Sequence, residues 1–134
     1  MVTSNRTVRH EADSRRVDAL NDLLRRRISV VDGITNLRQF PWDSPEELTV
    51  LTVADVVSAL ESWVLGDIDD QGLESWAEAI AGRDDVAMET KAADVLTQGL
   101  FELSSSELFG PVASTAPRLL ERLRAIPGSG DEAD

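Results

Sequence analysis

Several residue types on which enzymes and metal proteins depend are missing or scarce in this sequence. There is no cysteine, which excludes disulfides, thiolate metal sites and a cysteine nucleophile. The single histidine, His10, lies in a polar stretch near the N-terminus. The sequence therefore lacks the residues for a histidine-dependent catalytic triad or for a metal site with several histidines. No glycine-rich phosphate loop follows a predicted strand, and no pair of carboxylates shows Glu-x-x-His spacing. We therefore expect a protein that is not an enzyme and that holds no metal or cofactor.

Long apolar runs are also absent. No stretch approaches the roughly 20 apolar residues that a membrane span requires. Residues 1–16 lack the apolar segment of a secretory signal. These two observations predict a soluble protein of the cytoplasm that does not contact membranes.

Positive charge is scarce in the middle of the chain. The formal net charge is −12, yet residues 1–27 carry more arginines than acids, and residues 39–117 hold only Arg83 and Lys91 as cations. An acidic surface of this kind repels nucleic-acid phosphates and anionic membranes and attracts basic proteins. The alternative is that the acids only keep the protein soluble.

What remains is a pattern of amphipathic helices. Apolar residues recur at helical spacing in segments that begin with a capping residue and end at glycine or serine. The expected helices cover residues 13–27, 29–40, 52–66, 69–82, 84–103 and 114–126, and residues 48–52 are expected to form a short extended segment. The sequence therefore predicts an all-α protein with a single domain, an antiparallel bundle of five to six helices over residues 12–126. Residues 1–11 are expected to form a disordered arm and residues 127–134 a disordered acidic tail.

The chain is organised around residues 52–85, where two helices meet at a short acidic corner. Trp63 and Trp76 lie on the apolar faces of these helices, so we expect both to pack in the core. Trp42 lies between two prolines, where it either plugs the bundle or stays exposed as an anchor for a partner.

The corner allows a second interpretation, as a calcium loop over residues 67–78. Asp67, Asp69, Gly72 and Glu78 match positions 1, 3, 6 and 12 of such a loop. Against it, Gln71 and Glu74 occupy positions where Asp or Asn and an apolar residue are usual, and no second loop exists to pair with it. A capped helix corner without a metal is the favoured interpretation.

A small DNA-associated regulator is another alternative. The basic N-terminal helix, with Arg25, Arg26 and Arg27 at its end, could contact phosphates. The helix after the acidic corner offers only Glu74 and Glu78 to a nucleic acid, which makes binding of nucleic acid the less favoured reading.

At residues 23–37 and 60–85 the chain resembles small acidic helical immunity proteins of bacteria, of the colicin D immunity type. The resemblance rests on LLRRRISVVDGITNL and LESWVLGDIDDQGLESWAEAIAGRDD, in which a helix, an isoleucine corner and a cap lead into a second helix that is followed by acids. It implies a non-enzymatic inhibitor that covers a basic toxin nuclease with carboxylates. The residues predicted to bind such a basic protein partner are Asp67, Asp69, Asp70, Glu74, Glu78, Asp84 and Asp85, with Trp42 as an apolar anchor.

Overall fold

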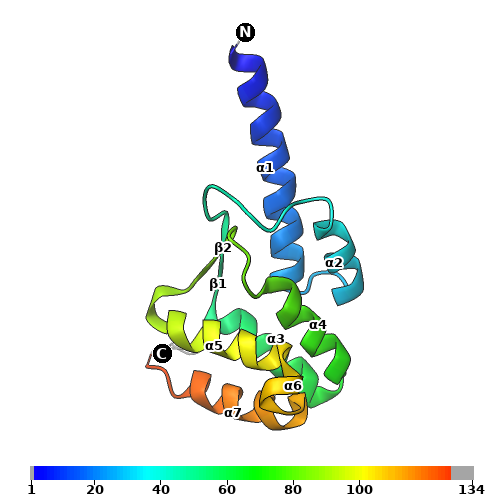
Figure 1. The fold of residues 1–134 in the computed structure, drawn as a ribbon, viewed down its shortest axis with the longest axis vertical. Helices are drawn as coiled ribbons and strands as arrows, with labels where there is room; N and C mark the ends of the chain where they lie inside the picture. The colour runs from blue at the N-terminus through cyan, green and yellow to red at the C-terminus, as the bar shows by residue number, and fades with distance from the viewer. Residues whose placement is uncertain (1, 128–134) are drawn as a thin grey trace.

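A computed structural model describes residues 2–127, and the side chains from residue 13 onward. Figure 1 shows a long first helix, α1, with α2 at its side and helices α3 to α7 gathered near its C-terminal end. The elements are α1 Val2–Leu24, α2 Val30–Leu37, β1 Thr49–Leu51, α3 Val53–Leu65, α4 Asp70–Ile80, β2 Val86–Met88, a 3₁₀ turn Thr90–Ala92, α5 Ala93–Ser104, α6 Ser106–Phe109 and α7 Val112–Arg124. The mostly helical fold is confirmed. An antiparallel bundle of five to six helices is not, because the described residues form seven α-helices and a small sheet.

Three predicted helix starts are confirmed by their capping hydrogen bonds. The Ser29 hydroxyl accepts from the backbone N–H of Asp32, and a carboxylate oxygen of Asp69 accepts from that of Gly72. Thr52 and Asp55 form a reciprocal capping box at the start of α3. Each bond satisfies a backbone donor that the first turn of a helix leaves without a partner, which is why these residue types begin helices.

The first helix starts earlier than the sequence predicts. Residues 2–11, expected as a disordered arm, are helical, because extending a helix that is already anchored costs much less than starting one. The helix ends at Leu24, not at Arg27, and Arg26 adopts a positive φ of 51° in the turn. From residue 128 onward, the predicted acidic tail lies outside the described residues. No helix among residues 2–127 is long and apolar enough to cross a membrane.

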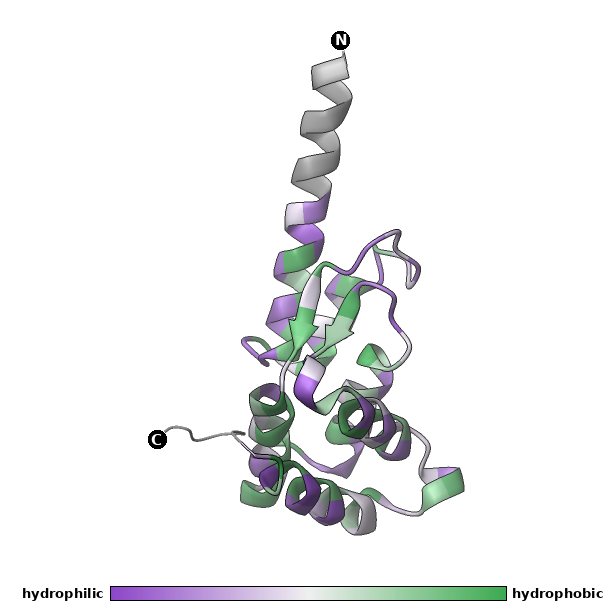
Figure 2. Cartoon of the chain, turned by 90° about the vertical axis from the view of Figure 1, so that its left-hand side faces the viewer, coloured by the Kyte–Doolittle hydropathy of each residue, from purple (hydrophilic) through white to green (hydrophobic). Residues whose placement is uncertain are grey.

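The predicted extended segment is confirmed as β1, but its partner strand was predicted as helix. Val86–Met88 form β2, which pairs in parallel with β1 in the register Thr49 to Val86. Both strands consist largely of apolar residues, green in Figure 2. The prediction of a helix over 84–103 is therefore wrong at its start, because pairing with a strand far away in the sequence overrides the local pattern. The helix proper, α5, begins at Ala93.

The last helix also differs from the prediction. It begins at Val112 after Pro111, two residues before the predicted start at 114, and Thr115 is buried in its first turns. A short helix, α6, occupies Ser106–Phe109, where the sequence indicated only a helix end and a turn.

A single leucine-rich core joins these elements, except α6, which has no buried residue. Helix α4 packs against α5, α2 packs against α1, and α7 packs against both α3 and α5. Trp76 is fully buried in this core, as predicted, and its Nε1–H donates to the carbonyl oxygen of Leu23 at 2.9 Å. The C-terminal end of α1 is therefore bonded directly to α4, the helix that follows the acidic corner.

Gly99 allows α5 to approach α7 closely. A Cβ atom on Gly99 would lie 2.6 and 2.8 Å from the two methyl carbons of Leu119, which is itself buried. We expect Gly99→Ala to lower the free energy of unfolding by about 1 kcal/mol. Overpacking against Leu119 costs about 1–3 kcal/mol, and the higher helix propensity of alanine offsets about 1 kcal/mol of that loss. Urea denaturation measures the change. In a Leu119→Ala background the same substitution is expected to stabilise the protein, and equal losses in both backgrounds would contradict the close approach.

Candidate protein-binding site

The acidic corner between α3 and α4 is held in one conformation by its backbone. Gly66 ends α3 in the left-handed region with φ 85°, which only glycine adopts without strain. The N–H of Asp67 donates to the carbonyl of Ser62 at 2.8 Å, and Asp69 caps α4. Asp67, Asp69 and Asp70 are consequently exposed on a short, well-bonded turn.

Apolar side chains lie directly beside these carboxylates. Trp63 is half-buried against the core, and its Nε1–H donates to Asp70 Oδ1 at 2.6 Å. The next two residues, Val64 and Leu65, are 62% and 77% exposed. An open depression of about 690 Å³ lies here, lined by Trp63, Val64, Gly66, Ile68, Asp69, Asp70 and Gln71. The corner therefore combines negative charge with exposed apolar surface.

Carboxylates continue along α4. Asp70, Glu74 and Glu78 follow one another at four-residue spacing, so they form a stripe along one side of the helix. Asp70 and Glu78 are exposed, and Glu74 is half-buried, with an oxygen that accepts from the Ser106 hydroxyl at 3.0 Å. We call Asp67, Asp69, Asp70, Glu74 and Glu78 together the acidic face. Within the described part of the chain, no arginine or lysine forms an ion pair with any of its five carboxylates.

The corner has the geometry of a capped helix start. Residues 70–80 are helical, so residues that would wrap around the ion in a calcium loop belong to α4 instead. An oxygen of the Asp69 carboxylate already accepts the capping hydrogen bond from the N–H of Gly72. Among the described residues, no cluster of three or more histidine, cysteine or acidic side chains has the arrangement of a metal site.

The neighbouring residues Asp84 and Asp85 differ in burial. Asp84 is exposed, whereas Asp85 is fully buried, so Asp85 does not belong to a partner-binding surface as the sequence suggested. The buried carboxylate is neutralised by two arginines: Arg16 Nε lies 2.8 Å from Oδ2, and Arg83 Nε lies 2.9 Å from Oδ1. Burying a carboxylate charge is costly unless it is paired and hydrogen-bonded in this way.

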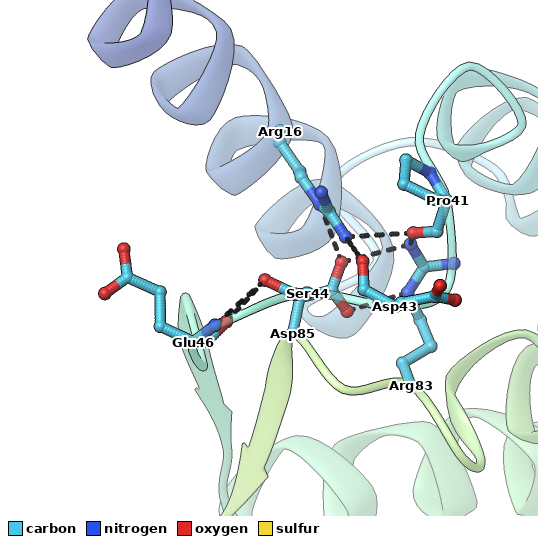
Figure 3. A network of polar contacts seen from close by, with 7 residues as sticks. All are labelled: Arg16, Pro41, Asp43, Ser44, Glu46, Arg83 and Asp85. Atoms are coloured by element: carbon cyan, nitrogen blue, oxygen red, sulfur yellow. Dashed lines mark hydrogen bonds and ion pairs between the residues drawn. The ribbon is translucent and has the colours of Figure 1, made fainter. Parts of the chain in front are cut away.

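The same arginines hold the loop that carries Trp42. Arg16 Nη2 donates to the carbonyls of Pro41 and Asp43, both at 2.9 Å, and Arg83 Nη2 donates to the Pro41 carbonyl at 3.1 Å. Figure 3 shows the two guanidinium groups converging on Asp85 and on this loop. Arg16 and Arg83 were not expected to have a role. The sequence offers no signal for Arg16, which lies 69 residues from its carboxylate.

Trp42 is exposed, one of the two outcomes that the sequence left open. Its side chain is 47% exposed, and the guanidinium carbon of Arg83 lies 4.9 Å from its ring centroid. The Trp42 carbonyl accepts from the N–H of Asp84 at 3.1 Å. Beside it lies a groove of about 630 Å³ between α2 and α4, lined by Ile34, Leu37, Arg38, Phe40, Pro41, Trp42, Ser75, Glu78, Ala79 and Arg83.

The arginines near the end of α1 are engaged within the protein. Arg25 pairs with Asp55, Arg26 donates to Ser58, and Arg27 pairs with Asp22. Phosphate contacts would have to compete with these bonds, which disfavours the alternative of a DNA-associated regulator. His10 lies in the part of α1 whose side chains the structure does not describe.

Comparison with known proteins adds no relative to this description. No family model matches the chain, and no curated protein and no solved structure matches it.

Proposed function

We propose that the protein is a non-enzymatic binding module that uses its acidic face to cover a basic protein partner. The observation that carries the proposal is the acidic face itself, five carboxylates on one corner and one helix without cation partners among the described residues. Elsewhere the chain pairs acids of neighbouring helices with arginines of α7, for example Glu61 with Arg124 and Glu102 with Arg122. Like charges at four-residue spacing on α4 destabilise the helix slightly, so a binding role gives this arrangement a function.

The exposed apolar residues at the corner support the same proposal. Val64 and Leu65 adjoin Asp67 and Asp69, so a partner would bury apolar surface at the place where its cations meet carboxylates. Burial of apolar area supplies affinity, whereas opposite fields mainly raise the association rate and select the partner. Proteins that act on nucleic acids carry cationic active sites, because their substrate is a polyanion. An inhibitor of a toxin nuclease, of the immunity type, is therefore the partner relationship that we favour.

The proposal is tested by removing charge without changing shape. The triple variant Asp67→Asn, Asp69→Asn, Asp70→Asn keeps a capping residue at position 69, since Asn caps helices as well as Asp does. We expect it to bind the partner recovered from the native host about 10–100-fold more weakly at low salt, because each exposed ion pair contributes up to about 1 kcal/mol. Calorimetry over a salt series measures the affinity, and a nuclease assay at equimolar protein measures inhibition.

A matched control removes three charges elsewhere. Asp94, Glu107 and Glu121 are exposed on α5, α6 and α7, so Asp94→Asn, Glu107→Gln, Glu121→Gln gives the same net charge. The control variant is expected to bind like the unmodified protein. Equal losses in both variants would mean that only net charge matters, and binding that is insensitive to salt would overturn the acidic face as the binding surface.

A further inference from the structure

The open depression at the α3–α4 corner combines apolar surface with two carboxylates. Among the described residues its lining is Trp63, Val64, Gly66, Ile68, Asp69, Asp70 and Gln71, which includes no arginine and no lysine. We call it the corner depression. Val64 is exposed, and Trp63 and Ile68 are partly buried against the core. An occupant of the depression therefore meets apolar surface and negative charge, and no positive charge from the lining.

Both carboxylates of the corner depression are oriented before anything binds, each through one oxygen. Asp70 Oδ1 accepts from the indole N–H of Trp63 at 2.6 Å, and Asp69 Oδ1 accepts from the backbone N–H of Gly72 at 2.8 Å. The other oxygen of each carboxylate, Oδ2, accepts no hydrogen bond within the described part of the chain. Ordering side chains at an interface normally reduces affinity, and carboxylates that are already ordered avoid that loss.

The charges around the depression select a cationic occupant. Asp67 is exposed on the same turn, and none of the ion pairs of residues 13–127 involves Asp67, Asp69 or Asp70. One turn before Leu65 on α3, Glu61 pairs with the Arg124 guanidinium at 2.7 Å, so that cation is already engaged. An occupant without positive charge would displace water from the two carboxylates and give them no partner, which costs free energy.

Among cationic side chains, arginine matches these groups best. Its methylene groups cover apolar surface while its charged end stays near water. The planar guanidinium presents five N–H donors in a fixed fork, which can serve two carboxylates at once, and it stacks on aromatic rings. The lysine ammonium is a compact and strongly hydrated point charge that gains less from an aromatic neighbour. The depression offers both features that favour arginine, the Trp63 ring and the free Oδ2 atoms of Asp69 and Asp70.

We propose that the corner depression is an arginine-binding site, in which one arginine side chain of the basic partner packs its methylene groups against Trp63 and Val64 and donates to the carboxylates of Asp69 and Asp70. This inference rests on the proposed function, because the arginine belongs to the partner that the acidic face covers. It adds that the acidic face does not recognise positive charge in general. One position of the partner must be arginine, and lysine at that position binds more weakly.

Three capped tripeptides test the site with the full chain. The probes are acetyl-Gly-Arg-Gly-amide, the same peptide with lysine, and the same peptide with citrulline, which keeps the shape of arginine without its charge. We expect the arginine peptide to bind about 5–10-fold more tightly than the lysine peptide, because stacking and forked hydrogen bonds are available only to arginine. The citrulline peptide is expected to bind more weakly than both. NMR titration at low salt, followed at the indole N–H of Trp63, measures the three affinities.

Substitutions assign the preference to the depression. Asp70→Asn removes one charge and keeps an oxygen that accepts from the Trp63 N–H, so it should weaken binding of the arginine peptide about 3–10-fold. Trp63→Leu removes the aromatic ring and keeps apolar volume, so the two cationic peptides should bind it with similar affinities, as measured at the backbone N–H of Gly72. The matched control Glu78→Gln removes one charge two turns further along α4, and it should change the affinities by less than about twofold. Thermal melting confirms that each variant is folded.

The outcomes separate the arginine site from the proposed function. Equal affinities of the arginine and lysine peptides, or a preference for arginine that survives both Asp70→Asn and Trp63→Leu, would overturn the site. Binding of neither cationic peptide, or citrulline binding as tight as arginine, would overturn it as well. The acidic face would remain in each case if the triple variant at Asp67, Asp69 and Asp70 loses its partner. A partner that binds the triple variant without loss would instead overturn the proposed function, and with it the origin of the arginine.

Discussion

Asp85→Ala is expected to lower the free energy of unfolding by about 3–5 kcal/mol, the loss typical when one partner of a buried ion pair is removed. The Asp85 side chain is fully buried, and that of Arg83 is only 3% exposed. Without the carboxylate, the two guanidinium groups would be left near one another, with the loop carbonyls as their hydrogen-bond partners among the described residues. Chemical denaturation followed by circular dichroism measures the change.

The neighbouring residue supplies a control for this substitution. Asp84 is exposed and forms no ion pair with a described residue, so Asp84→Ala should change stability by no more than about 0.5 kcal/mol. The combined replacement Arg16→Met, Asp85→Leu, Arg83→Met should cost less than Asp85→Ala, because it leaves no buried charge unpaired. A loss below about 1 kcal/mol for Asp85→Ala would show that the carboxylate is not buried as described.

Trp76→Ala is expected to cost about 3–5 kcal/mol, the range for deleting a large aromatic side chain from a core. Trp76 is fully buried and joins α4 to the end of α1. The substitution removes apolar contacts and also one of the two hydrogen bonds to the Leu23 carbonyl, which keeps the bond from the backbone N–H of Arg26. Thermal or chemical denaturation gives the loss of stability directly.

Trp76→Phe separates the hydrogen bond from the packing. Phenylalanine retains much of the ring volume and lacks the N–H, so we expect a loss of about 1–3 kcal/mol from the lost buried hydrogen bond and the smaller ring. Trp63→Phe is the control, because Trp63 is half-buried and its N–H serves an exposed carboxylate. Equal effects of phenylalanine at the two positions would contradict the buried bond to Leu23.

Helix starts could be predicted from the sequence because capping is a local interaction. Ser29, Thr52 and Asp69 each bond to a residue three positions ahead, so the whole interaction lies within four consecutive letters. The stripe of Asp70, Glu74 and Glu78 was equally accessible, since it follows from the helical period. The positions of the corner and of these three carboxylates on α4 therefore follow from local patterns in the sequence.

Interactions between distant residues were not accessible in this way. The pairing of Val86 with Thr49 turned a predicted helix start into a strand. Asp84 and Asp85 look alike in the sequence, and only the approach of Arg16 and Arg83 distinguishes the exposed carboxylate from the buried one. The groove beside Trp42 depends on the packing of α2 against α4, which no local pattern encodes.

The two short strands lie on either side of α3 and α4 in the sequence, so their hydrogen bonds close a loop of chain that contains the whole acidic face. The N–H of Leu48 donates to the Asp85 carbonyl at one end of the pair, and the N–H of Glu89 donates to the Leu51 carbonyl at the other. Loss of these bonds would free the ends of this loop and restore the conformational entropy that its closure removes. Exchange of the Leu48 and Glu89 amide protons with solvent therefore reports whether the proposed binding surface is assembled, independently of any partner.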